Sequence, residues 1–171
     1  MPRRAIKRTR RGFELRLGAD EREVLRGLPA QLRQLLEEES PSSDAAMARL
    51  YPPAYPDDPL RNLEYEMAAG DELTKQRLAA IGVMERSVDA ERLTEDELTA
   101  WIGVVNDLRL VLGTRLEITE ETREQDFPEG DPRRSAFALY AYLTYLVDEG
   151  VGALSGVSEL ESGPDDEGAA V

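Results

Sequence analysis

The chain contains neither cysteine nor histidine among its 171 residues. It therefore has no thiol nucleophile, no disulfide, no thiolate or imidazole metal ligand and no imidazole general base. Catalysis by carboxylates, lysine, tyrosine or serine stays open, but no pair of such groups stands at a recognisable spacing. Phosphate loops and dinucleotide fingerprints are also absent. We predict a protein that is not an enzyme, with no catalytic residue, no metal ligand and no cofactor.

Long apolar runs are missing as well. No stretch approaches the roughly 20 consecutive apolar residues of a membrane-spanning helix, and the first residues lack the apolar segment of a secretory signal. We expect a cytoplasmic protein without membrane contacts. With 41% of its residues hydrophobic, a chain of this length has material for one domain with one core.

Positive charge is scarce except at the N-terminus. The formal net charge is −14, yet six basic residues precede the first acidic residue, Glu14; they are Arg3, Arg4, Lys7, Arg8, Arg10 and Arg11. Leaving out these six positive charges takes the total from −14 to −20. Because so negative a body repels duplex phosphate, we predict that DNA contacts fall to residues 1–11, as a flexible basic arm. The alternatives are a solubilising tail or an arm that contacts its own acidic body.

The other end of the chain is acidic. From Asp148 onward there is no lysine or arginine, and glycine, serine and proline stand between the acids. This composition predicts disorder for residues 155–171. The expected organisation is a basic flexible arm at 1–11, a single helical domain at 12–154 and an acidic disordered tail at 155–171.

Helical periodicity dominates the central region. It predicts helices over residues 20–39 (with Pro29 inside), 44–50, 60–69, 71–88, 94–113 and 132–154. Thr94 and Glu97 form the clearest signal, a capping box that opens a helix closed by Gly113. Gly70 separates two of the predicted helices. The last helix is apolar on almost every side, which is typical of a central helix or of one that meets a partner.

Two short segments alternate apolar and polar residues instead. Residues 13–17 and the stretch around Leu116 and Ile118 have this period of two, which indicates half-buried strands that can pair with each other. We therefore predict a mainly α fold, a compact helical bundle with a minor two-stranded β element.

Arg109 falls inside the apolar arc of the helix at 94–113. An unpaired buried guanidinium is costly, so this side chain needs an acidic or carbonyl partner. It is either held for an acidic ligand or partner, or is structural, through an internal ion pair or a buried stem with its head in water. Asn106 lies at the edge of the arc and Asp107 away from it, as expected of capping, surface or network groups.

Two aromatic segments leave alternatives open. Tyr140, Tyr142 and Tyr145 place hydroxyls on one helix, either as core residues with wet tips or as a ligand site. Residues 50–59 hold four prolines and two tyrosines, and form either a packed connection or a proline-rich recognition site. No convincing helix-turn-helix is present, because the candidate recognition helices carry many acids.

Three segments carry a resemblance to a known family. They are Leu-Tyr-Pro-Pro-Ala-Tyr at 50–55 with Asp-Asp-Pro at 57–59, Trp-Ile-Gly-Val-Val-Asn-Asp-Leu-Arg-Leu-Val-Leu-Gly-Thr-Arg-Leu at 101–116, and Tyr-Ala-Tyr-Leu-Thr-Tyr-Leu at 140–146. In this order they resemble an actinobacterial domain-of-unknown-function family associated with AosR-type oxidative-stress transcriptional regulators. The resemblance runs from residue 12 to residue 154, and residues 106–116 are its most specific part.

The resemblance implies a non-enzymatic, transcription-associated regulator that works with an extracytoplasmic-function sigma factor. The family's regulatory scheme involves a redox-active cysteine pair. The 171 residues of this sequence include no cysteine, so they cannot supply such a pair. The polar positions that match the family are Asn106, Asp107, Arg109 and Arg115, which we predict to form a structural polar network.

Residues and resemblance together predict a regulatory protein that binds a protein partner and contacts DNA through the six basic residues of the arm. A homo-oligomer, in which a second copy of the chain is the partner, is an alternative. One alternative is a protein-only adaptor or anti-sigma-like factor whose acidic surface mimics nucleic acid. The alternative from another class is a carboxylate-based, metal-dependent hydrolase that uses acids near residues 117–121.

Overall fold

The computed structural model describes residues 3–41 and 43–156. In this part of the chain the α-helices are α1 (Ala19–Glu38), α2 (Ala45–Leu50), α3 (Pro59–Ser87), α4 (Glu95–Arg115) and α5 (Arg134–Ser155), and Glu124–Asp126 form the short 3-10 helix η1. The strands β1 (Ile6–Thr9), β2 (Gly12–Leu15) and β3 (Arg92–Leu93) form one antiparallel sheet in the order β1-β2-β3. The predicted mainly α fold is confirmed.

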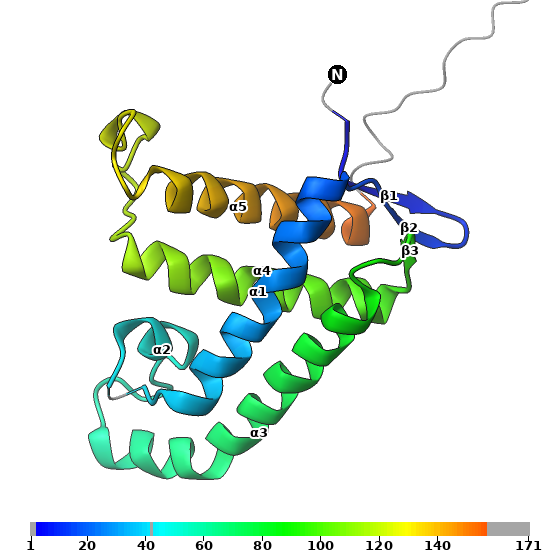
Figure 1. Ribbon diagram of the computed structural model, residues 1–171. Helices are drawn as coiled ribbons and strands as arrows, with labels where there is room; N and C mark the ends of the chain where they lie inside the picture. Colours follow the sequence, from blue (N-terminus) through cyan, green and yellow to red (C-terminus); the bar gives the residue numbers. More distant parts are fainter. Residues whose placement is uncertain (1–2, 42, 157–171) are drawn as a thin grey trace, which may run out of the picture.

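Helix α4 is the centre of the bundle. It packs against α5, α3, α2 and, where it crosses, α1. Figure 1 shows α4 and α5 side by side, with α1 running across them and the sheet at one end. Although α5 is the more apolar helix, its fully buried face is narrow, and Tyr145 and Val151 remain exposed on it. The central helix is therefore α4, which opens with the capping box, and not the more apolar α5.

Local signals explain where most helices begin. The Thr94 hydroxyl accepts from the Glu97 amide at 3.2 Å, and the Glu97 carboxylate accepts from the Thr94 amide at 2.8 Å. Asp44 likewise accepts from two amides at the start of α2. The predicted break at Gly70 is wrong, because α3 continues through it as one helix of 29 residues. A glycine inside a helix costs about 1 kcal/mol, which packing along the rest of α3 offsets.

The predicted two-stranded β element is wrong in its partner. Leu116 is the C-cap of α4, and the next residue, Glu117, turns left-handed with φ of 54°, so no strand forms there. Strand β2 pairs instead with β1 and β3, with Ile6 opposite Leu15 and Phe13 opposite Leu93. The residues after Glu117 lie in the loop between α4 and α5, whereas β1 is joined to β2 by a tight turn that places these two strands side by side.

The prediction of a flexible arm is wrong for residues 5–9. Ala5 and Ile6 are only 4% and 5% exposed and belong to the core, and residues 6–9 form β1. Residues 5–9 do not alternate apolar and polar side chains, so this highly charged segment carries no strand period in its sequence. At the other end, Ser155 closes α5, and residues 157–171 of the predicted tail lie outside the described residues.

The core lies where α1, α3, α4 and α5 meet. Its largest fully buried side chains include Leu25, Ile81, Met84, Leu98 and Leu143. The indole of Trp101 is buried among them and donates to the Ser87 hydroxyl at 2.8 Å, so this polar pair is satisfied inside the core. None of the helices in residues 3–41 and 43–156 is both long and apolar enough to cross a membrane.

Candidate functional site

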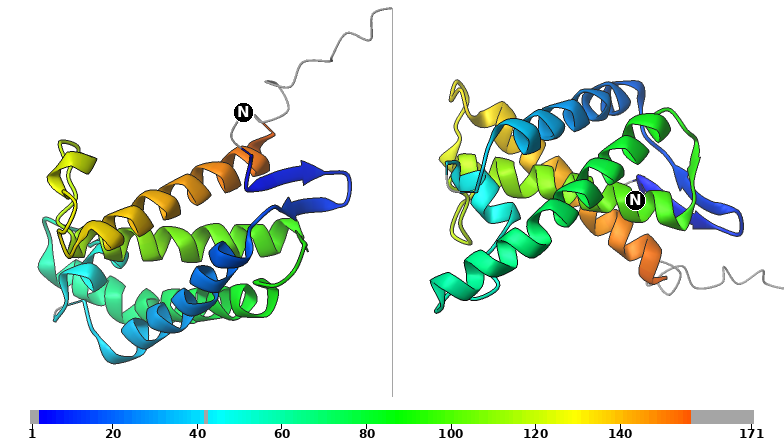
Figure 2. Two further views of the ribbon diagram at one scale, coloured as in Figure 1. Left: turned by 45° about the horizontal axis from the view of Figure 1, so that its top comes forward. Right: turned by 90° about the horizontal axis from the view of Figure 1, so that it is seen from below.

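The basic residues of the N-terminus lie on a β-hairpin that projects from the bundle. Strands β1 and β2 are joined at Arg10 and Arg11, and Figures 1 and 2 show the hairpin reaching beyond the helices. We call residues 6–15, with the turn, the basic hairpin. Its exposed basic side chains are Lys7, Arg8, Arg10 and Arg11; before the hairpin, Arg3 is exposed and Arg4 is half-buried.

Gly12 allows the hairpin to lie against β3. Its φ is 109°, and a Cβ at this position would come within 2.5 Å of the Leu93 carbonyl oxygen. Only glycine adopts this backbone conformation without strain while permitting so close an approach. The basic hairpin and β3 are therefore held in one sheet.

Two further arginines join the basic surface. Lys7, Glu14 and Arg92 are aligned across the three strands, and Arg16 donates to the Glu14 carboxylate at 3.2 Å. The hydrogen bond from Arg16, together with the charges of Lys7 and Arg92, holds the pKa of Glu14 below its ordinary value. One carboxylate thus faces three cations. Sequence reasoning missed Arg16 and Arg92, and nothing local signals Arg92, which strand pairing brings in from a distant position.

The base of the hairpin is fastened to α5. The Ala5 amide donates to the Glu149 carboxylate at 3.0 Å and to the Tyr145 hydroxyl at 3.2 Å, and Tyr145 donates to the Arg3 carbonyl at 3.3 Å. Arg8 donates to the Leu154 carbonyl at 3.3 Å. These bonds fix the direction in which the hairpin leaves the bundle.

The three tyrosines of α5 do not converge on one ligand site. Tyr145 bonds the hairpin, as above, whereas Tyr142 donates to the Glu21 carboxylate at 2.9 Å. Burial, and then the hydrogen bond to Glu21, raises the pKa of Tyr142 well above its ordinary value. Tyr140 lies on another side, against Gly113 of α4. Tyr142 and Tyr145 therefore link α5 to other elements of the fold.

The four polar residues predicted as one network do not all meet: only Asn106 and Arg109 bond each other. Asp107 is buried, not away from the apolar arc as predicted, and pairs with Arg77 of α3 at 2.6 Å. Burial raises the pKa of Asp107 more than Arg77 lowers it. Asn106 accepts from Arg109 at 2.8 Å. Arg115 is exposed and forms no ion pair within residues 3–41 and 43–156.

In the proline-rich segment between α2 and α3 the two tyrosines pack against α3, whereas Pro52, Pro53 and Pro56 are exposed. The Tyr51 hydroxyl bonds Thr74 of α3 at 2.8 Å, and the Tyr55 ring contacts Tyr65 edge to face at 6.2 Å between centroids. The Arg61 guanidinium lies 4.2 Å from the centre of the Tyr55 ring. Both tyrosines are therefore occupied in packing against α3.

The N-terminal half of α3 exposes large apolar side chains. Leu60, Leu63 and Met67 are 76%, 52% and 77% exposed and share one side of the helix. We call these three residues the α3 face. Figures 1 and 2 show this end of α3 reaching past α2, away from the core. Exposed acids flank the face at Glu64, Glu66 and Asp71.

The acids proposed for metal-dependent hydrolysis lie in the loop after α4. Glu117, Glu120 and Glu121 are all exposed. Within residues 3–41 and 43–156, no three or more acidic residues are grouped so that they could hold a metal ion.

Comparison with known proteins places the chain in a family. The family described as a domain of unknown function (DUF2017) matches residues 3–154. The chain belongs to the DUF2017 family. This match confirms the resemblance found in the sequence, and it begins before β1, so the basic hairpin is part of the DUF2017 region.

Relatives of this DUF2017 chain occur in mycobacteria. It is 35% identical over 155 residues to the putative oxidative stress regulator AosR of Mycobacterium leprae (strain TN), across 79% of this chain and 67% of the relative. It is 32% identical over 131 residues to the oxidative stress regulator AosR of Mycobacterium tuberculosis (strain ATCC 25618 / H37Rv), across 66% of this chain and 59% of the relative. The chain thus spans about three fifths to two thirds of the curated relatives. No solved structure matches it.

Proposed function

We propose that this protein is a non-enzymatic, transcription-associated regulator that contacts DNA through the basic hairpin and a protein partner through the α3 face. The names of the mycobacterial relatives support a regulatory role. The observation that carries the DNA contact is the basic hairpin itself, an outward-pointing cluster of cations on a chain of net charge −14. The protein partner that the family resemblance favours is a sigma factor of the extracytoplasmic-function class.

The shape of the hairpin suits a duplex. The major groove of B-DNA admits a two-stranded β-ribbon, and Arg10 and Arg11 at the turn are the cations farthest from the acidic helices along the hairpin. The remaining body repels phosphate, so attraction and repulsion together orient the hairpin toward DNA. Contacts from these cations to phosphates make the affinity depend steeply on salt.

The variant Arg10→Gln/Arg11→Gln tests this role. Deletion of residues 1–11 is unsuitable, because it would remove β1 and two core residues. Losing two phosphate contacts should reduce the slope of log affinity against log salt by about 1.8 and weaken duplex binding about 60-fold near 0.1 M salt. Fluorescence anisotropy with a short labelled duplex over a range of salt concentrations measures both quantities.

The control Lys75→Gln/Arg115→Gln removes the same charge from exposed positions on α3 and α4. It should change duplex affinity by no more than about twofold, since only long-range attraction is lost. Equal weakening by both double variants would show that the attraction is diffuse and would contradict a hairpin contact. A wild-type chain that binds no duplex at low salt would remove the DNA role altogether.

The second candidate function is a protein-only adaptor, and the α3 face favours it. A large exposed apolar face with acidic flanks suits an apolar segment of a basic protein. A second copy of this chain is a poorer occupant, because two such faces would bring Glu64 and Asp71 of each copy toward the same acids of the other. We therefore take a basic amphipathic helix of another protein as the occupant.

The variant Leu60→Ser/Met67→Ser tests the α3 face without changing the net charge. The probe is a synthetic helical peptide with leucines on one side and lysines on the other, and its matched control has glutamates in place of lysines. The variant should bind the lysine peptide about tenfold to 100-fold more weakly than wild type, because two large apolar contacts are lost. Calorimetry measures this difference.

The peptide and duplex measurements together separate the two functions. If the serine variant binds the lysine peptide with the same affinity as wild type, the attraction is due to charge alone, and docking on the α3 face is contradicted. Peptide binding that needs the face, in a chain that binds no duplex, favours the adaptor. Binding of both ligands by their separate surfaces supports the two-contact regulator.

A further inference from the structure

Arg109 has no acidic partner within the described structure. The side chain is half-buried, its Nη2 donates to Asn106 at 2.8 Å, and its buried Nε donates to no acceptor in residues 3–41 and 43–156. The chain has 35 acidic residues for 21 basic ones, so a carboxylate partner would have been easy to supply. The internal ion pair considered for Arg109 is therefore not formed in this part of the chain.

A second arginine meets Arg109 in one pocket. The pocket has a volume of ≈ 500 Å³ and lies where α2, α4 and α5 come together. Arg49 of α2 lines it with Arg109, and Arg49 makes no ion pair in the described part of the chain. A concavity of this size is in the range of small-molecule sites, about 300–1,000 Å³.

Apolar groups also line the pocket beside the two arginines. Leu110, Ile118 and the Tyr140 ring line the pocket. Gly113 lets the ring approach α4, since a Cβ there would lie 3.0 Å from the Tyr140 Cε2. Thr114 also lines the pocket, but its hydroxyl already donates to the Leu110 carbonyl at 2.8 Å. The charged donors of the site therefore come from the two guanidinium groups.

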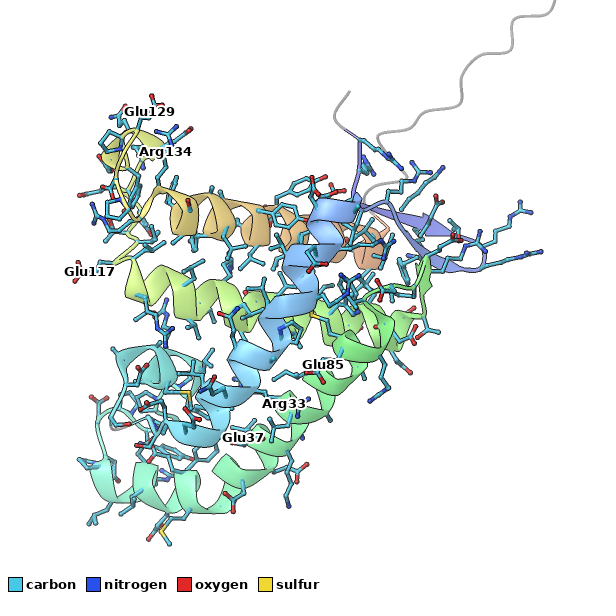
Figure 3. The ribbon with its side chains drawn as sticks, viewed as in Figure 1. Arg33, Glu37, Glu85, Glu117, Glu129 and Arg134 are labelled. Atoms are coloured by element: carbon cyan, nitrogen blue, oxygen red, sulfur yellow. The ribbon has the colours of Figure 1, made fainter. Side chains whose placement is uncertain are left out.

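Glu117 also lines the pocket, and it is exposed. Figure 3 shows it at the end of α4, with its side chain pointing away from the helices. It makes no ion pair with Arg49 or Arg109. With the nearby Glu120 and Glu121 it gives the surroundings a negative charge, which repels a long acidic segment of another protein more than a compact anion.

We propose that this pocket binds a small organic anion, a carboxylate or phosphate monoester joined to an apolar group. The charged group lies between Arg49 and Arg109 and accepts hydrogen bonds from their guanidinium groups. The apolar group rests on Leu110, Ile118 and the ring of Tyr140. The site is separate from the basic hairpin and the α3 face. Binding of such an anion would let this chain, which has no cysteine, respond to a small molecule without a thiol.

Titration followed by amide NMR shifts tests the proposal without DNA or a protein partner. The probes are benzoate for the carboxylate source, phenyl phosphate for the phosphate source and benzyl alcohol as the uncharged analogue. At least one anion should give saturable shifts centred on Arg109, Thr114 and Ile118, with a dissociation constant of about 1 mM for so small a probe. Benzyl alcohol should bind at least about tenfold more weakly.

Variants of Arg49 and Arg109 test whether these two side chains hold the anion. Arg109→Met and Arg49→Gln should each weaken anion binding about tenfold or more, whereas Arg115→Gln on the opposite side of α4 should leave it unchanged. Arg49 is exposed, so its variant keeps the test valid even if Arg109→Met alters folding.

The contradicting results are equally specific. Absence of saturable shifts, shifts centred elsewhere, or equal binding of benzyl alcohol would overturn the proposal. So would anion binding that survives both arginine variants. If an acidic peptide shifted these amides while neither small anion did, the pocket would be part of a protein interface instead.

Discussion

Replacing Arg77 by methionine is expected to lower the free energy of unfolding by about 3 to 5 kcal/mol, because it leaves the Asp107 carboxylate buried without a partner. Arg77 joins three helices. Its guanidinium pairs with Asp107 of α4 at 2.6 Å, donates to the Leu50 carbonyl at the end of α2 at 2.7 Å, and lies 5.1 Å from the centre of the Tyr51 ring. Urea unfolding followed by far-ultraviolet circular dichroism measures the loss.

The surface pair Arg33–Glu85 provides the matched control. It joins α1 to α3 at 2.7 Å, and both side chains are partly in water (Figure 3). Arg33→Met should cost about 1 kcal/mol or less. The double variant Arg77→Met/Asp107→Leu should recover much of the loss, because it removes the unpaired charge as well. A cost for Arg77→Met no greater than that for Arg33→Met would contradict the structural importance of the buried pair.

Lowering the pH should reduce the loss in free energy of unfolding that Arg77→Met causes. Burial raises the pKa of Asp107 in the folded protein above its pKa in the unfolded chain. The protonated carboxyl therefore contributes to stability at a pH below the unfolded-chain pKa, and this contribution is lost as the pH rises through the folded-state pKa. Removing Arg77 takes away the interactions that lower this pKa, which raises it further. The gap between wild type and variant should therefore narrow from pH 7 toward pH 4, as the buried carboxyl becomes protonated.

Gly12→Ala is expected to lower the free energy of unfolding by about 3 kcal/mol, through backbone strain and a backbone clash together. Alanine at φ of 109° is strained, and its Cβ would meet the Leu93 carbonyl, which cannot move without opening β2 from β3. Hydrogen exchange of the Leu15 amide, which donates to the Glu91 carbonyl at 2.8 Å, reports on this pairing directly.

Gly130→Ala separates the two causes. Gly130 also has a positive φ, 90°, but a Cβ there would meet nothing within 4 Å. Its variant should cost only about 1 to 2 kcal/mol, the strain alone. Equal costs for the two variants, or an unchanged exchange rate at Leu15, would show that β3 does not depend on the close approach at Gly12.

Much of the fold could be predicted because its signals are local. The capping box at Thr94 and the apolar spacing of the helices act within a few residues, and the structure forms these helices near the expected places. The predicted second strand failed for a tertiary reason as well as a local one. Residues 116–118 have an alternating pattern, but β2 obtains its partners from residues 6–9 and 92–93.

The candidate sites divide in the same way. The concentration of positive charge before Glu14 can be counted in the sequence, but its arrangement on a hairpin with Arg92 cannot. Arg109 could be recognised as a misplaced charge on its helix. Only the tertiary structure shows that Arg109 shares a pocket with Arg49 and bonds Asn106 instead of a carboxylate, because Arg49 and Arg109 come from separate helices.

The sequence by itself determined a mainly helical chain without thiol or imidazole chemistry and with its positive charge gathered at one end, since these properties follow from residue type and short spacing. Tertiary structure decided that the basic segment is a strand, that Asp107 is buried against Arg77, and that Arg109 opens onto a pocket. The physical reason is that strand pairing and burial depend on residues far apart in the chain, such as the 30 positions between Arg77 and Asp107, whose meeting is set by packing of the whole core.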